Sequence, residues 1–291
     1  MKRFILCFVL LGLLLSGCSQ AEIPAQVAAT TLPVYEFTTA LCAGTPITVT
    51  RLVTEEVSCL HDYSLNVRQV RAAEAAEWIV LSGAGLEEFL DDLLDGKETI
   101  DASAGIELLC PDEDLEHDHS HEGHHHESDP HIWLSPANAK IMAENICAGL
   151  SAKYPQYTQI FQQNLAELLI KLEALDAYGK ETLSVLSCRE MITFHDGFSY
   201  FAEAFDLTIL EAVEEESGSE ASARELIHLI EEVEHHNLPA IFTETNGSIS
   251  AAHIISRETG AKCFALDMAM SGDSYFDAMY HNIDTIKEAL G

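Results

Sequence analysis

Several histidines and carboxylates lie where a folded α/β chain could gather them around a metal ion. His61 follows one predicted strand, His195 and Asp267 end two others, and His131 follows an acidic loop. Because ligands of α/β sheets bind beyond the carboxyl ends of the strands, two facing halves would bring these four side chains together. Three imidazoles and one carboxylate suit tetrahedral Zn²⁺, whereas Mn²⁺ favours more oxygen ligands. Spacing alone leaves open that each histidine is an ordinary hydrogen-bonding residue, because the four lie far apart in the sequence.

Glu244 ends a further predicted strand at the same crevice. Its carboxylate could orient a ligand imidazole, serve as a fallback fourth ligand, or make only a structural hydrogen bond. Five other histidines lie on or beside helical patterns, and we expect them at the surface: His228, His235, His236, His253 and His281.

A His-rich run carries six of the fourteen histidines, namely His117, His119, His121, His124, His125 and His126. The surrounding residues 111–129 are acidic and lack apolar periodicity, which predicts a solvated loop. Flexible imidazoles and carboxylates can bind Zn²⁺ weakly in several registers. We expect the run to capture or sense zinc, the alternative being a charged loop without a metal.

The charge balance of the chain favours cations as ligands. Lys and Arg number 15 against 48 Asp and Glu, which gives a net charge of −33. Such an excess repels phosphate backbones and concentrates cations, so we expect no nucleic-acid partner. With 47% hydrophobic residues, the chain is also too apolar to be disordered as a whole.

The N-terminus reads as an export signal. A basic start precedes the apolar residues 4–15, which as a helix would span about 18 Å, well short of the ~30 Å hydrocarbon core of a bilayer. The following Leu-Ser-Gly-Cys resembles a bacterial lipobox, in which Cys18 is acylated. We therefore expect a lipoprotein signal peptide at 1–17, a tether at 18–26 and an extracytoplasmic protein that is lipid-anchored to the bacterial cell membrane.

The remaining cysteines are even in number, which outside the cytoplasm suggests disulfides. They are Cys42, Cys59, Cys110, Cys147, Cys188 and Cys263. Six cysteines allow fifteen pairings, and the sequence does not choose among them. Free buried thiols are the alternative for Cys147 and Cys263.

Strand-like and helix-like segments alternate along the chain. Strands are predicted at residues 27–32, 47–53, 78–83, 99–109, 191–195, 207–210, 240–244 and 262–267. Helices are predicted after a cap at Ser64, over 86–94, after Ser135-Pro136, and after a capping box at Ser222–Glu225. One long helical pattern runs from about residue 157 to 183.

This alternation predicts an α/β fold of two Rossmann-like (βα)4 lobes with parallel sheets, joined by one long rigid helix. The expected divisions are an N-terminal metal-binding lobe at 27–155 that contains the loop 111–129, a linking helix at 156–183, and a C-terminal metal-binding lobe at 184–291.

Motifs throughout the chain resemble those of the zinc-type solute-binding lipoproteins of metal ABC transporters, the ZnuA/TroA-like cluster. The most specific is Asp-Pro-His-Ile-Trp-Leu-Ser-Pro at 129–136; others are His-Asp-Tyr at 61–63, Leu-Ser-Gly-Ala-Gly-Leu-Glu at 81–87, Thr-Phe-His-Asp at 193–196 and Leu-Asp at 266–267. The resemblance implies that His61, His131 and His195 are imidazole ligands and Asp267 the fourth ligand. Manganese-type relatives usually have Glu at the position of His195, so histidine there favours zinc.

Three residues depart from the family pattern. Leu60 replaces a residue that is often small or acidic, which removes a candidate carboxylate and strengthens Asp267. Met268 stands where proline is common, and Cys59 lies unusually near the first ligand.

The resemblance implies a monomeric protein that captures Zn²⁺ in an interdomain cleft and delivers it to an ABC-transporter membrane permease. The alternatives are a manganese-type or adhesin-like metal-binding surface lipoprotein and a zinc hydrolase with Glu244 as its base. No HExxH motif occurs, and Asp267 would close the open position that a hydrolase needs, so we expect no enzyme activity.

Overall fold

The computed structural model describes residues 26–55, 57, 60, 63–109, 128–214, 221–245, 247 and 249–291. The predicted signal peptide, the predicted acylation site Cys18, the candidate ligand His61 and the His-rich run lie outside the described residues, as do Cys59 and Cys110. Within the described ranges, no helix has both the length and the apolar character needed to cross a bilayer.

Two separate four-stranded parallel sheets confirm the predicted fold class. The first contains β1 (Val27–Ala29), β2 (Val49–Arg51), β3 (Trp78–Leu81) and β4 (Glu98–Asp101) in the order β2-β1-β3-β4. The second contains β5 (Glu190–His195), β6 (Thr208–Glu214), β7 (Ala240–Glu244) and β8 (Lys262–Leu266) in the equivalent order β6-β5-β7-β8. In each sheet the strand order reverses between the two central strands, which is where α/β sheets open a crevice for ligands.

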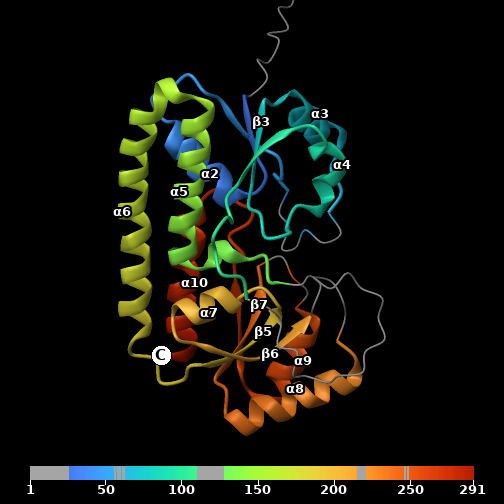
Figure 1. The fold of residues 1–291 in the computed structure, drawn as a ribbon. Coiled ribbons are helices and arrows are strands. Elements are labelled where there is room, and N and C mark those ends of the chain that lie inside the picture. The colour runs from blue at the N-terminus through green and yellow to red at the C-terminus, as the bar shows by residue number, and fades with distance from the viewer. Residues whose placement is uncertain are drawn as a thin grey trace, which may run out of the picture.

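The helices pack around and beside these sheets (Figure 1). Their bounds are α2 Leu32–Cys42, α3 Val67–Ala75, α4 Asp91–Leu94, α5 Pro136–Lys153, α6 Thr158–Leu183, α7 Ser199–Ala204, α8 Ala223–His236, α9 Ser250–Thr259 and α10 Tyr275–Leu290. Short 3-10 turns occupy Glu88–Leu90, Ile132–Leu134 and Pro155–Tyr157.

The predicted long helix is α6, which has 26 residues and runs alongside both lobes in Figure 1. Its apolar positions recur at spacings of three or four, so Phe161, Leu168, Leu172 and Leu175 all face inward and are buried. This face packs against α2 and α5 of the first lobe and α10 of the second. The helix therefore braces the two lobes along their common side.

The two lobes also share one hydrophobic core. A single cluster of buried side chains includes Val27 and Val80 from the first sheet and Met191, Phe242 and Leu266 from the second. The lobes are thus packed together as well as connected in sequence.

The segment after β8 fastens the second lobe to the first. The Leu32 amide donates to the Met270 carbonyl at 3.1 Å, and the Tyr275 amide donates to the Glu36 carboxylate at 2.6 Å. The Tyr275 hydroxyl donates to the Trp133 carbonyl at 2.8 Å. These bonds hold the residues around Asp267 against the first lobe.

Some element boundaries differ from the sequence predictions. The strand predicted at 27–32 ends at Ala29, because Leu32-Pro33 already opens α2, and the strand predicted at 99–109 ends at Asp101. The cap of α3 is Asn66 rather than Ser64: its side chain accepts the amides of Arg68 and Gln69. The predicted caps at Ser135 and Ser222 are confirmed.

The described cysteines carry free thiols. Cys42 and Cys147 are buried, and Cys188 and Cys263 are partly buried. No disulfide therefore joins any two of these four residues, which agrees with the free-thiol alternative for Cys147 and Cys263.

Candidate metal centre

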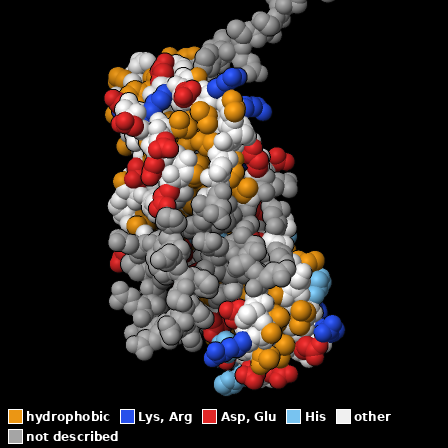
Figure 2. Space-filling view, turned by 90° about the vertical axis from the view of Figure 1, so that its right-hand side faces the viewer, with side chains coloured by type: hydrophobic (Ala, Val, Ile, Leu, Met, Phe, Trp, Pro, Cys, Tyr) orange, Lys and Arg blue, Asp and Glu red, His pale blue; other side chains and the backbone are white. Residues whose placement is uncertain are grey.

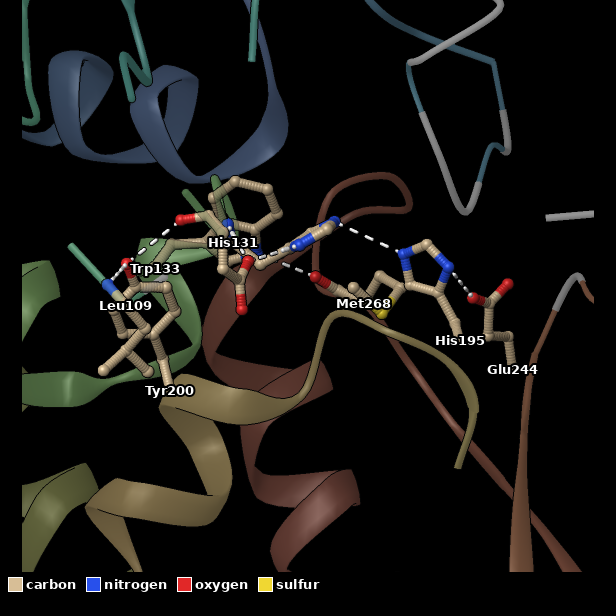
Figure 3. Close-up of polar contacts among 8 residues, drawn as sticks. Leu109, His131, Trp133, His195, Tyr200, Glu244 and Met268 are labelled. Carbon is tan, nitrogen blue, oxygen red and sulfur yellow. Dashed lines mark hydrogen bonds and ion pairs between the residues drawn. The ribbon is translucent and has the colours of Figure 1, made fainter. Parts of the chain in front are cut away.

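Two imidazoles from different lobes meet at the junction (Figure 3). His131 immediately precedes the turn Ile132–Leu134, and His195 is the last residue of β5. Their Nε2 atoms lie 3.3 Å apart, and the rings are nearly perpendicular, with an interplanar angle of 88°. Both residues are almost fully buried, at 2% and 1% exposure. The arrangement excludes bulk water from two nitrogen atoms that face each other.

A carboxylate holds the other nitrogen of each ring. His131 Nδ1 lies 2.8 Å from Asp129 Oδ1, which also accepts the His131 amide at 2.8 Å. His195 Nδ1 lies 3.2 Å from Glu244 Oε1 at the end of β7, on the side of the ring away from His131 (Figure 3). A carboxylate favours a proton on the nitrogen that it contacts, and this tautomer of the neutral ring leaves Nε2 as the lone-pair donor.

The spacing of these lone pairs fits a bound cation. Two imidazole nitrogens that face each other at 3.3 Å can share a proton or bind one cation between them. Tetrahedral zinc with Zn–N distances of about 2.0–2.1 Å would separate two nitrogen ligands by about 3.3–3.4 Å. The described pair therefore has the dimensions of one edge of a tetrahedral zinc site.

Asp267 follows β8 in a turn that is fixed on both sides. Its amide donates to Asn282 Oδ1 at 2.7 Å, and its own Oδ1 accepts the Ala269 amide at 2.7 Å. The neighbouring Met268 carbonyl accepts the indole N–H of Trp133 at 2.8 Å. Asp267 is therefore held in a turn that contacts the His131 segment.

Met268 and Gly197 shape the space beside His195. A Cβ added at Gly197 would lie 2.7 Å from His195 Cδ2 and 2.7 Å from Met268 Cε. A side chain at this position would therefore displace the His195 ring or the methionine. Met268 supplies an apolar wall at this point.

The described residues form only part of the predicted ligand set. Across the ranges that the structure describes, no group of three or more His, Cys, Asp or Glu side chains is arranged to hold a metal ion. Neither Asp267 nor Glu244 thus joins the two imidazoles as a third ready ligand. His61 and the six histidines of the His-rich run fall outside these ranges.

The histidines that we expected at the surface are found there. His228, His235, His253 and His281 are exposed, and His236 is partly buried between Glu190 and Glu232. Figure 2 shows histidine side chains at the surface of the C-terminal lobe. These residues are therefore separate from the buried pair.

Three residues that support the imidazole pair could not be singled out from the sequence: Asp129, Trp133 and Tyr200. Asp129 and Trp133 stand out only as parts of a motif, and Tyr200 does not stand out at all, although its hydroxyl donates to the Asp129 carbonyl at 3.0 Å. The available signal for Asp129 was its position two residues before His131 with a proline between them. Nothing local pointed to Tyr200, because its contacts join segments about 70 to 90 residues apart.

A second buried carboxylate braces the first lobe. Glu87 accepts the Thr30 hydroxyl at 2.7 Å and the amides of Ser82 and Gly83 at 2.6 and 3.0 Å. These partners follow β1 and β3, the central strands of the first sheet. Burial raises the pKa of Glu87 to about 7, against the opposing effect of the hydrogen bonds.

Each lobe contains a parallel β-sheet with flanking helices, and the lobes meet at a buried pair of imidazoles that carboxylates contact. This arrangement is that of a binding protein of the two-lobed α/β class. The chain belongs to the family described as zinc-uptake complex component A, periplasmic (ZnuA), whose model matches residues 27–289.

Relatives and solved structures agree with this membership. The chain is 33% identical to the zinc-binding lipoprotein AdcA of Streptococcus pneumoniae over 99% of its own length and 60% of that protein's length. It is 28% identical to a putative metal-binding protein of Treponema pallidum, covering 86% of this chain and 83% of the relative. The chain thus spans only about 60% of the AdcA relative that it matches.

The same fold occurs in two solved structures. The crystal structure of ZnuA aligns with a TM-score of 0.78 at 29% identity, covering 92% of this chain and all of that chain. The Zn(II)-bound ZnuA-like domain of S. pneumoniae AdcA aligns with a TM-score of 0.75 at 29% identity, covering 91% of this chain and 98% of that domain.

Proposed function

We propose that this protein captures Zn²⁺ outside the cytoplasm, at the junction of its lobes, and delivers it to an ABC-transporter permease. The observation that carries the proposal is the His131–His195 pair, with Nε2 atoms 3.3 Å apart and each Nδ1 at a carboxylate. The family to which the chain belongs is named for zinc uptake, and a structural relative is described as Zn(II)-bound. Zinc is therefore the cargo, and the protein is a transport component and not an enzyme.

The proposed ligands are His61, His131, His195 and Asp267. The two described imidazoles supply two nitrogens, and His61 would supply the third. Asp267 would supply the oxygen by turning its carboxylate from the Ala269 amide toward the ion. A set with three nitrogens favours zinc over manganese, which prefers more oxygen.

The contacts that hold the two lobes together limit the motions by which zinc could enter and leave. The shared core, α6 and the bonds of the 268–275 segment all oppose a wide hinge motion. Release would therefore involve small movements of the ligand segments at the junction. We retain 27–155 and 184–291 as metal-binding lobes that contribute ligands from opposite sides, with 156–183 between them.

The regions outside the described residues complete the proposal. Cys18 would carry a lipid anchor that keeps a monomeric protein at the cell membrane near its permease, and the AdcA relative is itself called a lipoprotein. The six histidines from His117 to His126 would collect zinc weakly and raise its concentration near the tight site.

Removing one ligand tests the proposal. Calorimetry should show tight zinc binding by the full chain and a loss of more than ~100-fold in affinity for His195→Ala, because one bond to the metal disappears. His228→Ala is the matched control, since its side chain is 52% exposed and contacts only a surface carboxylate among the described pairs. Unchanged tight binding by His195→Ala would refute the proposed site.

A further inference from the structure

The hydroxyl of Tyr200 bridges two segments of the opposite lobe. It accepts the Leu109 amide at 2.9 Å and donates to the Asp129 carbonyl at 3.0 Å (Figure 3). The Asp129 amide in turn donates to the Leu109 carbonyl at 2.8 Å. Three hydrogen bonds therefore join Leu109, Asp129 and Tyr200, and in the sequence the first two residues flank the His-rich run.

We propose that Tyr200 is a positioning residue, which sets the orientation of His131 by holding Asp129. The proposal rests on the zinc-binding function proposed above and extends it to a residue that does not touch the metal.

Asp129 contacts both Tyr200 and the imidazole of His131, so it links the two side chains. Its carbonyl is held by the Tyr200 hydroxyl, while its Oδ1 accepts both the amide and Nδ1 of His131 at 2.8 Å. A shift of the Asp129 backbone would therefore rotate or release the ring. The orientation of His131 Nε2 toward His195 depends on this short chain of contacts.

Tyr200 also belongs to the segment that carries the other imidazole. It lies in α7, which begins four residues after His195, the last residue of β5. The path from His195 through α7 to Asp129 links the two imidazoles through protein atoms alone. Their 3.3 Å spacing can therefore exist before zinc arrives.

Phenylalanine cannot replace this contact. Tyr200 is 2% exposed, so a water molecule has little room to take over from the lost hydroxyl. Tyr200→Phe keeps the ring and its packing but leaves the Leu109 amide and the Asp129 carbonyl without this partner. The variant therefore tests positioning with little change in shape.

The experiment measures zinc affinity by competition with a chromophoric chelator, and ligand geometry by the visible absorption of the Co²⁺-loaded full chain. Tyr200→Phe should weaken zinc binding by about 10-fold, the lower end of the effect of partners that orient metal ligands, and should shift the Co²⁺ bands. Tyr178→Phe is the matched control. The Tyr178 hydroxyl lies at the surface of α6 and donates to Asp284 at 2.6 Å, so the zinc affinity and the Co²⁺ bands of this variant should stay unchanged.

A double-mutant cycle separates positioning from general stability. If Tyr200 acts through Asp129, Tyr200→Phe should have little further effect in an Asp129→Asn background. Additive losses, or a Tyr200→Phe protein with wild-type affinity and wild-type Co²⁺ bands, would overturn the inference. Failure of the wild-type chain to bind zinc would instead refute the proposed function.

Discussion

At the scale of single residues, the proposed metal site depends on carboxylates that orient its two described imidazoles. Asp129 and Glu244 each contact an Nδ1 atom, and both imidazoles turn Nε2 toward the same point. Burial strengthens these contacts, because electrostatic interactions are less screened in a protein interior than in water. Metal affinity should therefore depend on residues that never touch the metal.

Replacing Glu244 by Gln should weaken zinc binding by about 10- to 100-fold, because the amide neither stabilises the Nδ1 proton as a carboxylate does nor raises the basicity of Nε2. Competition titration against a chelator measures the change.

Glu211→Gln is the matched control for this prediction. Its carboxylate lies at the same distance of 3.2 Å from an imidazole nitrogen of His228, but at the surface. Equal affinities for all three proteins would show that Glu244 does not assist the metal site.

Part of this site could be predicted from the sequence. His131, His195 and Glu244 were identified as candidates, and the structure places all three together. They were identified because motif resemblance and the ends of apolar runs are visible in a sequence. Tyr200 was missed because its role depends on tertiary contacts between distant segments, which no local pattern encodes.

At the scale of elements, the two central strands of the second sheet position two of the functional side chains. His195 ends β5 and Glu244 ends β7, and these strands are neighbours where the strand order reverses. All eight described strands were predicted, most of them from short apolar or β-branched runs. Boundaries were predicted less well: Ser64 and Asn66 are equally good cap residues, and only the capping box of Asn66 with Gln69 decides between them.

The buried carboxyl group of Glu87 predicts that the free energy of unfolding depends on pH. Burial raises the pKa of Glu87 from 4.5 to about 7, so in this interval the folded state binds more protons than the unfolded state. The contribution of Glu87 to stability is thus fully present below about pH 4.5 and is lost as the pH rises through about 7.

Urea unfolding of the metal-free chain and of Glu87→Gln between pH 5 and 8 measures this effect. The wild type should lose stability relative to the variant as the pH rises to 7, on the order of 1 kcal/mol per pH unit. If the difference in unfolding free energy between the wild type and Glu87→Gln stays constant, or changes in favour of the wild type as the pH rises, the raised pKa of Glu87 is contradicted.

At the scale of the whole molecule, the two lobes behave structurally as one packed unit. They share a core, a 26-residue helix braces them, and the segment after β8 is bonded across the junction. The sequence predicted the two sheets and the long helix. It did not predict the shared core, because side chains from both lobes join it only after folding.

Calorimetry of the metal-free chain should therefore show a single cooperative unfolding transition, with equal calorimetric and van't Hoff enthalpies. Two resolved transitions would mean that the lobes unfold independently and that the junction is weaker than its contacts indicate.

X-ray crystallography of the zinc-loaded chain, with anomalous data collected at the zinc edge, tests the central claim most directly. We predict one strong zinc peak at the lobe junction, with Nε2 of His131 and His195 at about 2.0–2.1 Å, and with His61 and Asp267 completing the tetrahedron. A strong peak elsewhere, with these two imidazoles still 3.3 Å apart and free of metal, would contradict the account.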